Sequence, residues 1–253
     1  MGLDIYAGTL IRYYSRNWKT SVQQWGEANG MQVNIIRPEE QNVELASVEE
    51  ITEGVTDWRD QLIQAFAGEL TDQPHWNEDN DVTPYYTDKP DWDAVEALML
   101  YTLCKIQGID IPSKVVKNFD IYKQPVYKEF MENKNNAISL FDSDGWWIPI
   151  SDSFMFNGYL PTGDKRMIAT TGMLRNELEA INSIEWNADE QTIISWRETE
   201  GYPTDALYKN GQVEYIGKNE EYGTVSLAKF AFSILWQAVD HSLKYGTMII
   251  YDY

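Results

Sequence analysis

The sequence of 253 residues contains one cysteine and two histidines. A single cysteine cannot form an intrachain disulfide, so nothing in the sequence depends on an oxidising compartment. Cys104 lies in an apolar stretch, 98–104, where we expect a small buried side chain rather than a reactive thiol. Two histidines also restrict zinc ligation and histidine acid–base chemistry, and we expect no metal and no other cofactor.

Basic side chains are scarce, because 20 Lys and Arg stand against 40 Asp and Glu, for a net charge of −20. Nucleic-acid backbones and anionic membrane surfaces are bound mainly through lysine and arginine, and no basic run occurs here. We therefore expect neither a nucleic-acid partner nor a membrane partner. A basic protein or a cation is the natural electrostatic complement.

Long apolar runs are missing, and none approaches the roughly 20 residues that cross a bilayer. The first residues carry Asp4 where a signal peptide has basic and then apolar side chains, so the expected location is cytoplasmic. The sequence also lacks the common phosphate-binding loops, the His-Glu-x-x-His motif and the Gly-x-Ser-x-Gly motif. These absences favour a non-enzymatic protein, and they leave the catalytic residues of any enzyme unknown.

Apolar and aromatic residues are plentiful, with 10 Trp and 16 Tyr, which indicates a packed globular body. We expect strands at 2–14, 31–36, 166–170 and 247–253, and hairpins at 138–150 and 208–216. We expect helices at 17–29, 47–68, 91–107, 125–132, 171–181, 188–198 and 224–244. Asn17 and Ser47 are the expected N-caps of the first two helices, and Gly54 is a possible break in the second.

Strands at both ends with helices between them predict an α+β fold. The sheet is expected to be mixed or mostly antiparallel and packed with several helices, with the N- and C-terminal strands adjacent. No internal repeat or low-complexity linker occurs, so residues 1–253 are expected to form a single domain. Residues 39–107 are a candidate acidic helical lobe within it.

The acidic excess is concentrated in residues 39–96, which contain 17 acidic side chains against only Arg59 and Lys89, a net charge of −15. Three interpretations remain open: a solvated face, a docking surface for a basic protein, or a cation site. Two fragments, 79–81 and 142–145, have alternating oxygen ligands. Neither has the later glutamate of an EF-hand loop, so no metal site is expected at either.

The polar stretch 69–90 is the strongest candidate for a functional segment, because long loops in compact proteins often carry function. The candidate partner-binding residues there and just beyond are His75, Trp76, Glu78, Asp79, Asp81, Asp88 and Asp91. His241 lies near the end of the last expected helix. An imidazolium there would interact favourably with the helix dipole, so we expect a structural role.

Two functions follow from these features. The first is a non-enzymatic acidic binding protein, immunity-like or inhibitor-like, that docks a basic protein partner. The alternative is a carboxylate-dependent hydrolase acting on a carbohydrate-like substrate, since paired acids and exposed aromatic rings are typical of glycosidases. Its best candidate cluster is Trp146 and Trp147 beside Asp142 and Asp144, although strand alternation predicts that at least one of these tryptophans is in the core.

Several stretches resemble a family of bacterial cytoplasmic proteins of unknown activity. They are residues 1–10 with Tyr13, Tyr14 and Trp18, residues 85–92, residues 146–147 with 151–154, and residues 160–163 with 169–172. The resemblance covers most of the chain and implies a bacterial origin and a single structural unit. It implies no activity, cofactor or catalytic residue.

Overall fold

The computed structural model describes residues 2–31, 46–133, 137–209, 212–215 and 217–253. Its contacts divide the chain into two compact units. The sheet unit consists of Leu3–Lys89, Ile138–Glu177 and Ala238–Tyr253, and the helical unit consists chiefly of Pro90–Ala137 and Leu178–Gln237. The organisation of the chain as a single domain stays a prediction.

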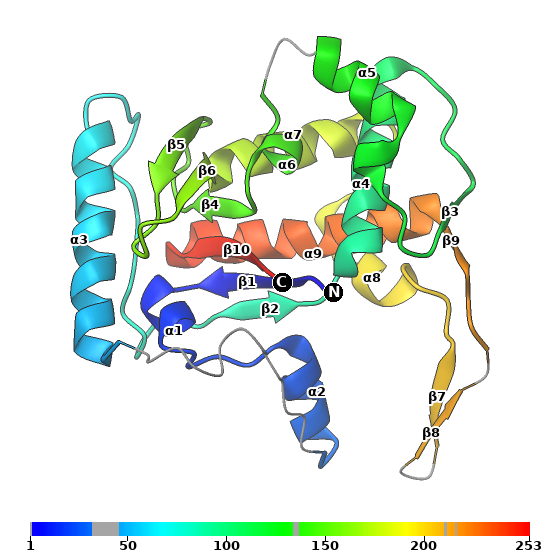
Figure 1. Ribbon diagram of the computed structural model, residues 1–253, viewed down its shortest axis with the longest axis horizontal. Coiled ribbons are helices and arrows are strands. Elements are labelled where there is room, and N and C mark those ends of the chain that lie inside the picture. The colour runs from blue at the N-terminus through cyan, green and yellow to red at the C-terminus, as the bar shows by residue number, and fades with distance from the viewer. Residues whose placement is uncertain (1, 32–45, 134–136, 210–211, 216) are drawn as a thin grey trace. The chain divides into compact units, whose positions relative to one another are not determined.

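The sheet unit contains a six-stranded mixed sheet in the order β2-β1-β10-β4-β6-β5 (Figure 1). The strands are β1 (Asp4–Gly8), β2 (Tyr86–Asp88), β4 (Trp146–Ile148), β5 (Met155–Tyr159), β6 (Lys165–Thr170) and β10 (Met248–Asp252). Only the β4–β6 pair is parallel among these neighbours. The N- and C-terminal strands lie side by side, with Tyr6 opposite Ile250, so the predicted α+β class and the adjacency of the two ends are confirmed.

The helices of the sheet unit are α1 (Leu10–Tyr14), α2 (Ser21–Ala28), α3 (Val48–Phe66) and α6 (Ser139–Asp142), with the first part of α7 (Thr171–Ile184) and the end of α9 (Thr224–Tyr245). One face of the sheet supplies a hydrophobic core of alternate strand residues, among them Tyr6, Ile168 and Ile250. Val55 of α3 is buried in this core, and Trp58, Leu62 and Ile63 pack against it. These residues recur at helical spacing, so they form the core-facing side of α3.

The helical unit contains α4 (Asp91–Gln107), β3 (Lys114–Val116), η2 (Ile121–Lys123), α5 (Pro125–Asn133), α8 (Glu190–Thr199), β7 (Ala206–Lys209), β8 (Gln212–Tyr215) and β9 (Glu221–Gly223), with most of α9. All residues of α4 from Ala94 to Cys104 are buried, because this stretch is apolar nearly all round the helix. Cys104 is 1% exposed, so its predicted role as a small buried side chain is confirmed. Trp186 packs edge-on against Phe232 of α9.

The beginning of the chain differs from the sequence-based expectation. The first strand ends at Gly8 instead of residue 14, because Thr9 adopts an extended backbone and its side chain accepts a hydrogen bond from the Arg12 amide, which starts α1. The next helix begins at Ser21 and not at residue 17, since Thr20 forms a capping box with Gln23. The strand expected at 31–36 lies almost wholly outside the described residues.

The hairpin expected at 138–150 is also wrong. Residues 139–142 form the short helix α6, and β4 pairs with β10 and β6 instead. The helix forms because Glu177 accepts hydrogen bonds from the Ser139 amide (2.5 Å) and the Leu140 amide (3.1 Å), a distant partner that a local pattern does not reveal. Strand β5 was not expected at all.

Among the described residues, no helix combines the length and apolar character needed to cross a membrane.

Candidate functional site

Residues 69–90, which we call the acidic loop, follow the end of α3, return alongside that helix and include β2 (Figure 1). The loop is fixed at several points. The Thr71 hydroxyl bonds to Asp152 (2.5 Å), and the Asn77 amide donates to the Gly246 carbonyl (2.7 Å). The ring of Trp76 meets that of Trp58 on α3 edge-to-face, with 5.5 Å between centroids. The loop is therefore part of the folded body.

Two of the candidate residues point inward. Trp76 and Glu78 are 8% and 6% exposed. One Glu78 oxygen accepts a hydrogen bond from the Trp76 indole (2.9 Å), and the other accepts one from the Ile11 amide at the start of α1 (3.2 Å). Burial raises the pKa of Glu78 to about 7, although these donated hydrogen bonds oppose the shift. Glu78 attaches the loop to α1, and its burial removes it from any surface that a partner could reach.

A second attachment lies beside the first. Arg12 is 8% exposed, its guanidinium donates to the Asn80 carbonyl, and the Thr9 hydroxyl bonds to the Asn80 side chain. Arg12 also lies over the ring of Tyr85, 5.2 Å from its centroid. The inner side of the acidic loop therefore packs against the start of α1 and has a structural role.

The remaining candidates divide by exposure. His75, Asp79 and Asp81 are exposed on the acidic loop, where the Asp79 side chain accepts a hydrogen bond from the Asp81 amide (2.9 Å). Asp88 is buried and accepts a hydrogen bond from the Lys89 amide (2.8 Å). Asp91 begins α4 in the helical unit. Of the seven candidates, the structure leaves three exposed together on the loop.

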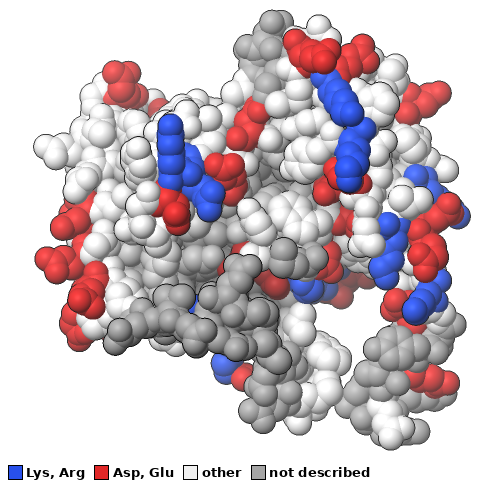
Figure 2. Space-filling view, in the orientation of Figure 1, with Lys and Arg blue, Asp and Glu red and all other residues white. Residues whose placement is uncertain are grey.

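The structure reveals a further acidic feature on α3. Glu49, Glu53 and Asp57, which we call the acidic stripe, recur every four residues and are all exposed. None of the three forms an ion pair with a described residue, whereas the next carboxylate, Asp60, pairs with Arg59 (2.7 Å). Figure 2 shows acidic side chains gathered over α3, at the left of the view. The four-residue spacing could have revealed the stripe from the sequence.

The acidic stripe should make α3 less stable than it could be. Like charges four residues apart destabilise a helix by about 0.2–0.5 kcal/mol per pair, and Glu53 belongs to two such pairs. We expect Glu53→Gln to raise the free energy of unfolding by roughly 0.5–1 kcal/mol in urea titrations. Glu190→Gln, which removes a carboxylate from the favourable first turn of α8, should lower it slightly. A loss of stability in Glu53→Gln would contradict this view of the stripe.

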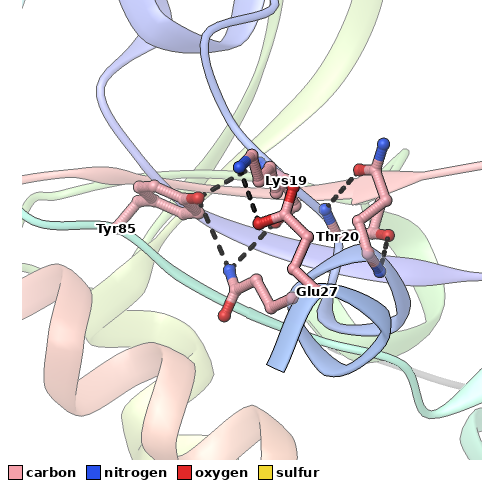
Figure 3. A network of polar contacts seen from close by, with 6 residues as sticks. Lys19, Thr20, Glu27 and Tyr85 are labelled. Carbon is pink, nitrogen blue, oxygen red and sulfur yellow. Dashed lines mark hydrogen bonds and ion pairs between the residues drawn. The ribbon is translucent and has the colours of Figure 1, made fainter. Parts of the chain in front are cut away.

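The α2 helix is joined to the acidic loop by a polar network (Figure 3). The Lys19 amide donates to the Tyr85 hydroxyl (3.1 Å), and the Lys19 ammonium pairs with Glu27 of α2 (2.7 Å). Thr20 caps the same helix. The positive charge of Lys19 is thus offset within its own segment and not by the acidic loop.

The cluster considered for a hydrolase has a different character. Trp146 and Trp147 are 8% and 1% exposed, so both rings belong to the interior and neither is presented to a sugar. Asp142 accepts a hydrogen bond from the Ile138 amide (2.9 Å), and Asp144 accepts one from the Met167 amide (2.7 Å). These carboxylates have local structural partners, and the hydrolase alternative stays a prediction without a supporting observation.

His241 contacts the acidic loop. Its Nε2 lies 3.1 Å from the Pro84 carbonyl, and its ring lies near those of Tyr86 and Tyr245. Burial lowers the pKa of His241, so the site favours the neutral imidazole rather than the imidazolium expected from the helix dipole.

No group of three or more histidine, cysteine, aspartate or glutamate side chains among the described residues is placed to hold a metal ion. Comparison with known proteins adds no relative: no protein-family model, no curated protein and no solved structure matches this chain. The bacterial family that the sequence resembles therefore stays a prediction, and the site has to be interpreted from its own geometry.

Proposed function

We propose that this chain is a non-enzymatic binding protein that docks a basic protein partner, in the manner of an immunity protein or inhibitor. The acidic stripe of α3, together with the exposed carboxylates of the acidic loop, is the proposed docking surface. The observation that supports the proposal is a row of three exposed carboxylates without ion pairs to described residues, in which Glu53 is repelled by a like charge on both sides. Stability given up at an exposed position is typical of a binding surface.

The attachment of the loop supports the same proposal. Glu78, Asn80 and Asn77 tie the loop to α1 and to the chain after α9, so Asp79 and Asp81 are displayed from a fixed backbone. A fixed surface loses little conformational freedom when a partner binds. Concentrated charge of one sign also accelerates the encounter with a partner of opposite charge and disfavours wrong partners.

The geometry of the stripe indicates what the partner presents. Glu49 and Asp57 are eight residues apart on one helix, which corresponds to about 12 Å along its axis. We expect the partner to present two or three lysine or arginine side chains over a similar length. A guanidinium can bind a carboxylate through two parallel hydrogen bonds, so arginine fits best.

The proposal is tested by capture from a bacterial lysate with three immobilised proteins. They are the wild type, the stripe variant Glu49→Gln/Glu53→Gln/Asp57→Asn, and the control variant Glu132→Gln/Glu179→Gln/Glu214→Gln, which removes three exposed carboxylates elsewhere. We expect wild type and control to capture the same basic protein, released by salt, and the stripe variant to capture at least tenfold less.

The two variants have the same net charge. A difference in capture between them therefore reports the position of the removed carboxylates and not their number. Circular dichroism and thermal unfolding should show that both variants are folded. Capture of an identical set of proteins by all three forms, or capture that raising the salt concentration leaves unchanged, would contradict the proposal.

A further inference from the structure

The helical unit contains a large open cavity of about 1070 Å³ that is lined by residues of α4, β3 and α5 and of the chain between them. All of its lining residues belong to the segment 100–133. Its buried lining residues include Leu100, Cys104 and Val115, and the half-buried rings of Phe119 and Phe130 also line it. A mainly apolar cavity of this size, with a few polar groups, is typical of a small-molecule site.

The mouth of the cavity exposes apolar side chains that a folded chain normally covers. Ile106, Ile109 and Val116 line it and are 49%, 47% and 55% exposed. Single exposed apolar residues are ordinary, but a group of them around one cavity marks a binding surface.

The charges of the lining are unbalanced in favour of acid. Asp110 and Glu129 are exposed carboxylates of the cavity lining. The cation among the lining residues, Lys114, pairs with Glu221 of the neighbouring strand β9 (3.0 Å). The side-chain amide of Gln107 donates to the Val126 carbonyl (2.9 Å), so this polar group is engaged within the wall.

The wall is held in place by carboxylates of α4. The Phe119 amide donates to Asp93 (3.1 Å), and the Ile121 amide donates to Glu96 (2.8 Å). These two bonds fix the backbone that carries the Phe119 ring. The cavity is therefore formed before any ligand arrives, which lowers the entropic cost of binding.

We propose that this cavity binds a hydrophobic organic cation. The apolar body of the ligand would lie on Leu100 and Val115, and its positive charge would lie near the rings of Phe119 and Phe130. Aromatic faces attract cations, and this attraction is stronger where the contact excludes water. Asp110 and Glu129 then supply charge of the opposite sign, whereas a fatty acid or another anion would meet no unpaired cation in the described lining.

Two probes of nearly equal size and shape but opposite charge test the proposal: tetraphenylphosphonium and tetraphenylborate. We expect calorimetry to detect binding of the phosphonium to the full chain, at least tenfold tighter than that of the borate. Asp110→Asn/Glu129→Gln should weaken phosphonium binding about tenfold and bring the affinities for the two probes closer together. Val116→Lys, which adds a cation at an exposed position of the lining, should weaken it further without disturbing the fold.

The stripe variant of α3 serves as the control, because it removes acidic charge from the sheet unit and leaves the cavity lining intact. Its affinity for the phosphonium should stay within about twofold of the wild-type value. Equal or tighter binding of the borate, binding of neither probe, or a loss as large in the stripe variant as in Asp110→Asn/Glu129→Gln would each overturn the proposal. None of these outcomes bears on capture of a basic protein by α3.

Discussion

Gly246→Ala should lower the free energy of unfolding by about 3 kcal/mol or more and release the acidic loop. Gly246 ends α9 with φ +67°, a left-handed conformation that costs a residue with a Cβ about 1–2 kcal/mol. An added Cβ would lie 2.9 Å from the His75 carbonyl carbon and 3.2 Å from the Asn77 nitrogen. The Gly246 carbonyl accepts a hydrogen bond from the backbone amide of Asn77. A shift of the loop that relieves the clash would therefore break one of the hydrogen bonds that attach the loop.

Gly108→Ala is the matched control for this substitution. Gly108 ends α4 with the same φ of +67°, but nothing lies within 4 Å of an added Cβ there. Gly108→Ala should cost only about 1–2 kcal/mol, which is the backbone strain alone. Chemical denaturation gives both values, and hydrogen exchange of residues 71–83 reports release of the loop. Equal losses of stability in the two variants would show that the loop does not press on Gly246.

The contribution of Glu78 to the stability of the protein should fall steeply as the pH rises from about 4.5 to about 7. Burial raises the pKa of Glu78 from the ordinary value of 4.5 to about 7, so the folded chain binds this proton more tightly than the unfolded chain. The stability that Glu78 contributes is therefore present below pH 4.5 and is lost as the pH rises through 7. The shift corresponds to about 3 kcal/mol.

Glu78→Gln removes this titration, so the variant should lose about 3 kcal/mol less than the wild type between pH 4.5 and pH 7.5. The comparison uses the slope of the free energy of unfolding against pH. Glutamine offers one acceptor oxygen and one amino group to the two N–H donors, so the substitution also changes the stability by an amount that does not depend on pH. Burial raises the pKa values of Glu96 and Glu177 to about 7 as well, and both residues remain in the variant. Glu132→Gln, a control that keeps Glu78, should show the same dependence of the free energy of unfolding on pH as the wild type. Parallel curves for Glu78→Gln and the wild type would contradict the role of Glu78.

The parts of the fold that the sequence predicts are those with strong local signals. Helix α4 is apolar nearly all round and stops at Gly108, which has a positive φ. Helix α3 begins with a complete capping box between Ser47 and Glu50. The first and closing strands are short and almost entirely buried, and they pair antiparallel.

The parts that the sequence does not predict depend on distant partners. Helix α6 has four residues, and its first amides are bound by Glu177, 38 residues away along the chain from Ser139. Strand β5 is a half-exposed edge of the sheet without clear alternation, so its pattern carries little signal. Helix α1 has five residues, and helices this short are stable only through tertiary contacts such as the Glu78–Ile11 bond.

The candidate site follows the same division. Composition located the acidic segment and the loop, because charge can be counted without a structure. It could not separate Glu78, which is buried and attaches the loop to α1, from Asp79, which is exposed beside it. Burial of that kind depends on where α1 and Trp76 lie, and no local pattern encodes it.

The proposed docking is tested most directly by the association rate constant of the captured basic protein, measured from 50 mM to 500 mM salt. Exposed charges act mainly on association, and salt screens them over about 10 Å at 0.1 M. We expect the rate constant of the wild type and of the control variant to fall by roughly tenfold or more over this range. At low salt, the association rate constant of the stripe variant should already be near the wild-type value at 500 mM salt, and it should change little as salt is added. The dissociation rate constants should be similar for all three proteins. A stripe variant that associates as fast as the wild type at low salt, with the same salt dependence, would contradict docking on α3.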